Sequence, residues 1–189
     1  MKGIDVSYHN GDIDWQAVKD AGIDFVIVRS SYGLQSKDDR FTEYVAGAKA
    51  VGIKIGAYHY SYALSATDAI KEAANCREAV DKASIALDLP IFFDMEDADG
   101  YKERNGFAFD PAEITDMCKA FIDNVGLDCG VYASYYWLTK YIDWRSIGCA
   151  VWNAQWGKTD DIKGYMWQFT DSLNIDGRMF DGNILYGEN

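Results

Sequence analysis

Apolar residues are arranged along this chain in two alternating ways. Short continuous apolar runs predict buried strands, and apolar residues that recur with the helical period predict amphipathic helices. Up to about residue 146 the two patterns alternate. The predicted strands are 2–7, 25–32, 54–62, 90–96 and the start of 129–137. The predicted helices are 14–22, 38–52, 65–84 and 110–125, followed by a short one that reaches about Tyr141.

The helix after Asp110 has the clearest boundaries. Asp110 is a strong N-cap residue, Pro111 suits the first helical position, and Glu113 completes the capping-box spacing. Gly126 follows the last apolar position and suits the end of the helix. Asp14 caps the first predicted helix in the same way.

Strand and helix in regular alternation predict a parallel sheet, because parallel neighbours need crossover connections. After about residue 146 three strand candidates follow, 149–156, 165–170 and 177–185, joined by short loops rich in Gly and Asp. A full eightfold β/α barrel takes about 250 residues. The 189 residues therefore predict an α/β fold of a single domain: an incomplete TIM-like barrel of about eight strands and about five helices.

The composition is that of a globular protein with many aromatic side chains, including 13 Tyr and 6 Trp. Aromatic faces serve as sugar platforms as well as core, and core is the more common use. The formal net charge of −12 argues against nucleic acid or an anionic membrane surface as a partner. No apolar segment approaches the roughly 20 residues of a membrane-spanning helix.

The N-terminus lacks the basic and apolar regions of a signal peptide, since Met1 leads directly into a predicted strand. The sequence thus favours either export by another route or a signal that has been trimmed.

Most cofactor and nucleophile motifs are missing. The 4 cysteines have no C-x-x-C spacing, which favours buried thiols and leaves one disulfide open. The only histidines, His9 and His59, form no metal-binding motif. No G-x-S-x-G and no phosphate-binding loop is present. We expect no cofactor and no metal.

Polar and aromatic residues recur near the ends of successive predicted strands, where the active sites of β/α barrels are built. The residues are Asp5, Arg29, Tyr32, Tyr58, Tyr60, Asp94, Glu96, Tyr132, Ser134, Gln155, Gln168 and Asp181.

Asp94 and Glu96 lie two positions apart at the end of the predicted strand 90–96. Alternation along a strand places both on one face, roughly 6.6 Å apart. Such a pair suits cleavage of a glycosidic bond, in which one carboxyl must be protonated and the other charged. If Asp5 and Asp181 come from neighbouring strands, they join this cluster, and Glu96 with its longer side chain is our candidate acid. Two other interpretations stay open, a solvated polar rim and a Mg²⁺ or Ca²⁺ cage.

Several segments, in order along nearly the whole chain, together resemble the family 25 glycoside hydrolases, a lysozyme family. These are "GIDVSYHNGDIDW", "FVIVRSSYG", "GAYHYSYA", "IFFDMED", "GVYASYYWL", "VWNAQWG" and "MWQFTDSLNIDGRMFDGNIL". The family tends to show "vDlN" where this chain has "FDGN", so we align Asp181, rather than Asp176, with the family's acidic residue.

The resemblance implies a flattened β/α barrel that hydrolyses the β-1,4 bond between N-acetylmuramic acid and N-acetylglucosamine in peptidoglycan. It implies catalytic roles for Asp5, Asp94, Glu96 and Asp181. Glu96 matches the acid/base, and Asp94 matches a nucleophile or a carboxylate that orients the 2-acetamido group. The enzyme is expected to act outside the cell on the wall, as a phage lysin or a secreted enzyme, and as a monomer.

We further expect a set of residues to line the sugar groove, namely Arg29, Tyr32, Tyr58, Tyr60, Tyr132, Trp152, Gln155 and Gln168. His59 is predicted to face the helices instead. The alternatives are a catalytically inactive sugar-binding domain, a metal-dependent hydrolase and a chitinase-like enzyme. Phe92 stands where the chitinase motif D-x-x-D-x-D-x-E has an aspartate, which argues against the last.

Overall fold

The computed structural model describes residues 1–186, and in that range the chain forms nine strands and seven α-helices. The strands are β1 (Lys2–Val6), β2 (Phe25–Tyr32), β3 (Ser36–Lys37), β4 (Lys54–Tyr60), β5 (Ile91–Asp94), β6 (Cys129–Ser134), β7 (Ala150–Ala154), β8 (Met166–Ile175) and β9 (Arg178–Leu185). The helices are α1 (Trp15–Asp20), α2 (Phe41–Ala50), α3 (Ala66–Ala83), α4 (Tyr101–Arg104), α5 (Pro111–Val125), α6 (Tyr135–Lys140) and α7 (Trp144–Ile147). A short 3-10 turn, η1 (Tyr8–Asn10), follows β1.

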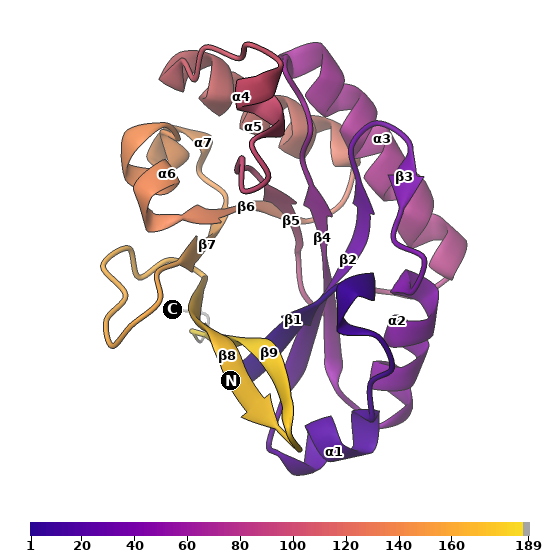
Figure 1. The fold of residues 1–189 in the computed structure, drawn as a ribbon. Coiled ribbons are helices and arrows are strands. Elements are labelled where there is room, and N and C mark those ends of the chain that lie inside the picture. Colours follow the sequence, from indigo (N-terminus) through magenta and orange to yellow (C-terminus); the bar gives the residue numbers. More distant parts are fainter. Residues whose placement is uncertain (187–189) are drawn as a thin grey trace.

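Eight of the described strands close into a barrel (Figure 1). Neighbours from β1 through β2, β4, β5, β6, β7 to β8 pair in parallel, and β9 closes the ring by pairing antiparallel with both β8 and β1. The two-residue β3 is added to the edge of β2. The predicted TIM-like barrel with missing late helices is confirmed, and the helices number more than the predicted five because α4 and α7 are too short to show a period.

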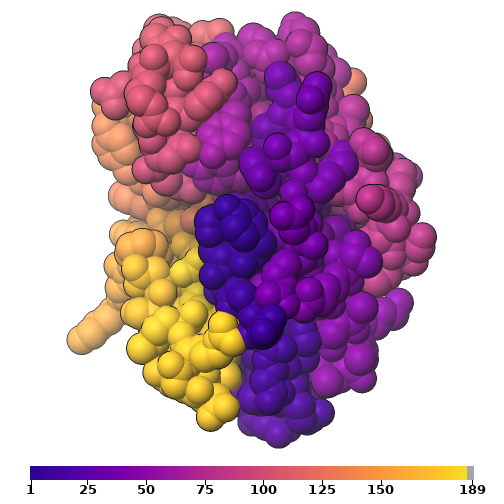
Figure 2. Space-filling model, turned by 45° about the vertical axis from the view of Figure 1, so that its right-hand side comes forward, coloured from indigo at the N-terminus to yellow at the C-terminus, as the bar shows by residue number. Residues whose placement is uncertain are grey.

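The β8–β9 hairpin replaces the last helical units of a complete barrel. Figures 1 and 2 show it beside the N-terminal residues, and Arg178 donates hydrogen bonds to the carbonyl oxygens of Asn10 and Asp12. The antiparallel register of β1 and β9 sets Asp5 directly opposite Asp181. The two most distant predicted site residues in the sequence are therefore cross-strand neighbours.

Two apolar layers surround the strands. The larger lies between the barrel and its helices, and the smaller fills the barrel interior with residues that include Phe25, Phe92, Trp152 and Met166. Phe92 and Phe93 fall in different layers, as strand alternation requires. His59 faces the helices, where it is fully buried with its ring stacked at 6.3 Å from that of Phe93.

The local signals used for prediction act as expected. The Asp110 carboxylate accepts hydrogen bonds from the amides of Ala112 and Glu113, and Gly126 takes a φ of 68° just after α5. Asp14 caps α1 in the same way. All four cysteines are free thiols. Among residues 1–186 no helix combines the length and apolar character needed to cross a membrane.

Candidate active site

A cleft of about 390 Å³ lies where the carboxyl ends of the strands meet. It is built from side chains that are far apart in the sequence but belong to adjacent strands. Four residues were predicted to be catalytic and eight to line the sugar groove. Ten of these twelve line the cleft: Asp5, Arg29, Tyr58, Tyr60, Asp94, Glu96, Tyr132, Trp152, Gln168 and Asp181. The barrel closure therefore brings together most of the set expected from the sequence.

Asp5 is held firmly at the base of the cleft. Its Oδ2 accepts hydrogen bonds from Asn183 Nδ2 at 2.7 Å and Gln168 Nε2 at 3.0 Å, and its carboxyl also shares a hydrogen bond with Asp181. Gln168 Oε1 in turn accepts from the hydroxyl of Tyr132 at 3.1 Å. This network fixes the orientation of Asp5 because both amide side chains are themselves buried.

Asp181 carries the proton of the Asp5–Asp181 pair. Burial and the neighbouring Asp5 carboxylate raise the pKa of Asp181 to about 8. Burial raises the pKa of Asp5 as well, but hydrogen bonds from Asn183, Gln168 and Asp181 oppose that effect. At neutral pH Asp181 is therefore the protonated partner of the pair, and the hydrogen bonds to Asp5 favour the charged form of that carboxyl.

We expect Asp181→Asn to stabilise the fold at alkaline pH. The pKa of Asp181 is raised in the folded state. The free energy of unfolding therefore falls as the pH rises from the ordinary pKa of an aspartate toward about 8. Asn cannot ionise and keeps an amide donor for Asp5. Thermal melts should place the variant's midpoint about 2–4 °C above the parent's at about pH 9 and level with it at about pH 3. An equal offset at both pH values would contradict the shared proton.

Asp94 and Glu96 form the second carboxyl pair. Asp94 is the last residue of β5, and Glu96 lies just beyond it, so the predicted strand 90–96 ends two residues early. The amide of Met95 still donates to the carbonyl of Tyr132 at 3.0 Å, which keeps the chain beside β6. Both carboxyls face the cleft. Oδ1 of Asp94 is buried and has no hydrogen-bond partner among residues 1–186.

The pKa values of both carboxyls are raised. Burial and then repulsion from Glu96 raise the pKa of Asp94 well above its ordinary value. Burial raises the pKa of Glu96 to about 7, with Asp5, Asp99 and Asp97 adding to the rise. The Lys102 ammonium opposes both shifts. A carboxyl with a pKa near 7 can donate a proton at neutral pH and accept it back, which is the requirement for a general acid/base.

Aromatic rings form the walls of the cleft at different depths. Trp152, predicted to bind substrate, is 1% exposed and packs 4.4 Å from the Tyr132 ring, so it supports the floor from below. Trp156 at the rim is 61% exposed and donates from Nε1 to Gln168 Oε1 at 3.1 Å. Sequence reasoning did not select Trp156, although its place at the end of a predicted strand marks it.

A second cavity of about 470 Å³ adjoins the cleft around Arg29. Arg29 forms a buried salt bridge from Nε to Asp38 at 2.9 Å, and its guanidinium lies 4.9 Å from the Tyr8 ring centroid and 5.1 Å from that of Tyr32. Tyr32 lines this second cavity and not the catalytic cleft. These contacts hold the Arg29 side chain rigidly between the two chambers.

A second residue predicted to line the cleft lies outside it, and three residues outside the predicted set support the site. Gln155 does not line the cleft, because its side chain bonds to Asp161 Oδ2 at 2.6 Å and to the Asp161 amide at 3.0 Å in the loop after β7. Asp97, just beyond β5, accepts hydrogen bonds from the amides of Lys102 and Glu103 in α4. Asn183 and Lys102 belong to the site's supporting structure and were not selected from the sequence. Strand alternation from Asp181 places Asn183 on the same face and gives the signal for it.

Metal binding finds no matching ligand group in the described part of the chain. Among residues 1–186 no three His, Cys, Asp or Glu side chains are grouped as a metal site. Asp5, one of the carboxyls of the cleft, is instead hydrogen-bonded to the side-chain amides of Gln168 and Asn183 and to Asp181.

The profile of the Glycosyl hydrolases family 25 matches residues 4–178, which is most of the chain and runs from within β1 to the first residue of β9. The chain belongs to this family. The family 25 domain is 29% identical over 183 residues to the autolytic lysozyme of Clostridium acetobutylicum, covering 94% of this chain and 52% of that protein. It thus spans about half the length of this curated relative.

Solved structures of other proteins are similar to nearly the whole domain. One is the modular autolysin LytC from Streptococcus pneumoniae in complex with a synthetic peptidoglycan ligand, with a TM-score of 0.86, 26% identity, and coverage of 98% of this chain and 46% of that one. Another is the catalytic domain of endolysin ply40 from bacteriophage P40 of Listeria monocytogenes, with a TM-score of 0.79, 23% identity, and coverage of 98% and 93%. At 23% identity, the similarity to the ply40 domain shows a shared fold alone.

Proposed function

We propose that this family 25 domain is a muramidase that hydrolyses the β-1,4 bond between N-acetylmuramic acid and N-acetylglucosamine in bacterial peptidoglycan. The observation that carries the proposal is the pair formed by Asp94 and Glu96 at the base of an open cleft, with the pKa of Glu96 raised to about 7. A glycosidase needs one carboxyl that is protonated at working pH beside others that are charged.

Glu96 is the general acid/base in this proposal. Its proton passes to the glycosidic oxygen as the bond to the anomeric carbon breaks, and the resulting carboxylate then takes a proton from the attacking water. The ordered Asp5 carboxylate supplies negative charge opposite the positive charge that develops on the sugar. Asp181 keeps Asp5 oriented by sharing its proton.

Asp94 orients the 2-acetamido group of the muramic acid residue. Its buried Oδ1 has no partner among residues 1–186, and the acetamido N–H is a donor that would satisfy it. The acetamido oxygen then attacks the anomeric carbon from within the substrate. The alternative is direct attack by Asp94, which leaves a glycosyl ester on this residue that mass spectrometry of the quenched protein would detect.

The defining test is mass spectrometry of purified peptidoglycan after digestion, with borohydride reduction of the products. The expected result is a set of fragments that end in reduced N-acetylmuramic acid, together with a loss of wall turbidity. Fragments that end in reduced N-acetylglucosamine would overturn the bond assignment. Wall binding in a pull-down with no released fragments would favour the inactive sugar-binding domain, and cleavage of chitin oligomers would favour the chitinase-like alternative.

The substrate places the site of action outside the bacterial membrane, on the glycan strands of the wall. A lysozyme and a phage endolysin among the similar proteins support this location. We infer that the 189 residues act as one catalytic domain, and the monomeric state remains a prediction.

A further inference from the structure

Lys102 is a buried lysine directly behind the catalytic pair. It lies in α4 and is 1% exposed, which makes it one of the largest fully buried side chains of the protein. Its Nζ donates to the main-chain carbonyl of Glu96 at 2.9 Å and to the carbonyl of Ser61, just after β4. An ammonium ion is this deeply buried only when charges and hydrogen bonds around it compensate for lost water.

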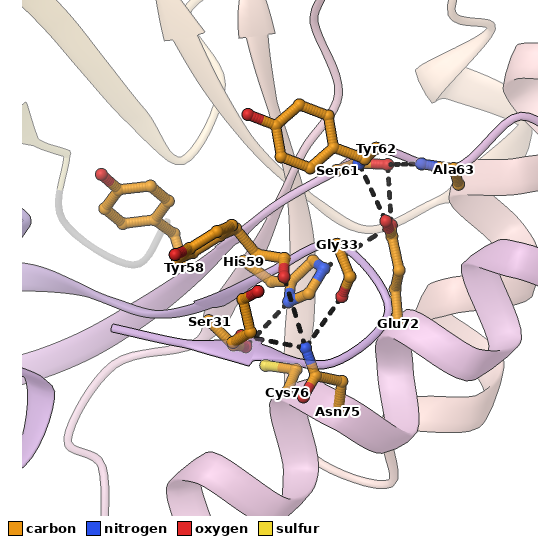
Figure 3. A network of polar contacts seen from close by, with 12 residues as sticks. Ser31, Gly33, Tyr58, His59, Ser61, Tyr62, Ala63, Glu72, Asn75 and Cys76 are labelled. Atoms are coloured by element: carbon orange, nitrogen blue, oxygen red, sulfur yellow. Dashed lines mark hydrogen bonds and ion pairs between the residues drawn. The ribbon is translucent and has the colours of Figure 1, made fainter. Parts of the chain in front are cut away.

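A second buried charge lies on the other side of Ser61. Glu72 of α3 is fully buried, and Figure 3 shows its carboxylate beside Ser61, Tyr62 and His59. Glu72 Oε2 accepts from the Ser61 hydroxyl at 2.8 Å, and Oε1 accepts from the Tyr62 amide at 2.8 Å. Ser61 therefore links the two ions, since its hydroxyl binds Glu72 and its carbonyl binds Lys102.

The ammonium is attached to the segment that carries the catalytic carboxyls. By bonding the carbonyls of Ser61 and Glu96 it ties the end of β4 to the turn after β5. Asp97 strengthens the same joint, because its carboxylate accepts from the Lys102 amide at 2.7 Å. Since α4 is only four residues long, these bonds, rather than helix propagation, hold it in place.

We propose that Lys102 is a positioning residue for the hydrolysis: its ammonium fixes the turn that carries Glu96 and sets the pH range in which Asp94 and Glu96 work, with Glu72 as its buried counter-charge. The inference rests on the proposed function of Glu96.

The electrostatic contacts agree with this geometry. Burial raises the pKa of Glu96, and Lys102 is the strongest influence that lowers it; Lys102 also lowers the pKa of Asp94. Burial lowers the pKa of Lys102 itself, and four carboxylates counter that effect and keep it charged. Titratable groups face Lys102 from α3, from β5 and the turn that follows it, and from α5, namely Glu72, Asp94, Glu96, Asp97 and Cys118.

The test compares pH profiles of kcat/KM on soluble glycan fragments for the full chain and three variants. Lys102→Met removes the charge and keeps an unbranched chain, so both limbs of the profile should move up by about one pH unit, with about a tenfold loss on the acid side. Lys102→Arg keeps a charge, so its profile should stay near the parent's even where its rate falls. Glu72→Gln removes the counter-charge, so its limbs should move down.

A uniform loss at every pH in Lys102→Met and Glu72→Gln, without movement of either limb, would overturn the proposal, because a purely structural role predicts that result. Where Lys102→Met does not fold, Glu72→Gln decides alone, since its isosteric amide keeps an acceptor for Ser61: a downward shift supports the proposal and an unmoved profile refutes it. Glu96→Gln measured in the same assay separates the two proposals, because its full activity would refute the proposed role of Glu96, whatever the profiles of the other variants.

Discussion

Glu96→Gln is expected to abolish almost all wall hydrolysis, with a fall of about 10³-fold or more in kcat. The glutamine has the same shape and fits the same place, but it has no proton to donate to the leaving oxygen. Because burial raises the pKa of Glu96 to about 7, this carboxyl is protonated in the parent enzyme below about pH 7. The substitution removes this protonated form. Release of reducing ends from purified walls measures the effect.

Glu103→Gln is the matched control for this substitution. Glu103 is an exposed carboxylate on α4, close to Glu96 in the sequence, and its side chain does not line the cleft. Its loss should leave the rate within about twofold, as expected for a surface substitution away from the site. Glu96→Gln protein that lyses walls as fast as Glu103→Gln protein would show that another group donates the proton.

Much of the site follows from periodicity alone. The spacing of Asp94 and Glu96 at the end of an apolar run places two carboxyls on one side of one strand, and the structure brings both into the cleft. Parallel strands place their carboxyl ends on one rim, so Arg29, Tyr58 and Tyr132 gather there whatever the details of the loops. These positions depend on strand direction, which the alternation of strands and helices indicates for the parallel part of the sheet.

Other parts of the site depend on long-range packing. Asp5 and Asp181 become neighbours only because β9 runs antiparallel to β1, and the sequence signals the strand without its direction. Gln155 lies at a strand end, as predicted, but turns toward Asp161 in its own loop. A one-residue change of direction at a strand end decides whether a side chain faces the cleft.

Lys102 shows most clearly why part of the machinery is not readable from sequence. In the sequence it is one basic residue in a polar segment, and such residues are mostly exposed. The residue is buried because α4 packs at the end of β4, where the carbonyl of Ser61 accepts a hydrogen bond from Lys102 Nζ. The four residues of α4 are too few to show a helical period in the sequence. Three separate segments have to come together before the residue acquires a partner.

The second large effect is expected for Asp94→Asn, which should lower kcat by about 10²- to 10³-fold with little change in KM. Asn keeps an oxygen in place of Oδ1 and nearly the same volume, so substrate still binds. It removes the carboxylate that stabilises the positive charge developing on the sugar and its acetamido group. The charge matters mainly in the transition state, because the ground-state acetamide is neutral and is held well by either side chain.

Asp116→Asn provides the comparison for Asp94→Asn, since Asp116 is exposed on α5 and does not line the cleft. Steady-state kinetics on soluble glycan fragments separates kcat from KM for both proteins. A rise in KM with unchanged kcat would mean that Asp94 only binds sugar, and parental values for both constants would remove it from the mechanism.

Walls N-deacetylated at muramic acid distinguish the two roles of Asp94. They should resist the parent enzyme if the acetamido oxygen attacks the anomeric carbon. If Asp94 is the nucleophile, the enzyme should cleave them and carry the glycosyl ester on the Asp94 carboxylate.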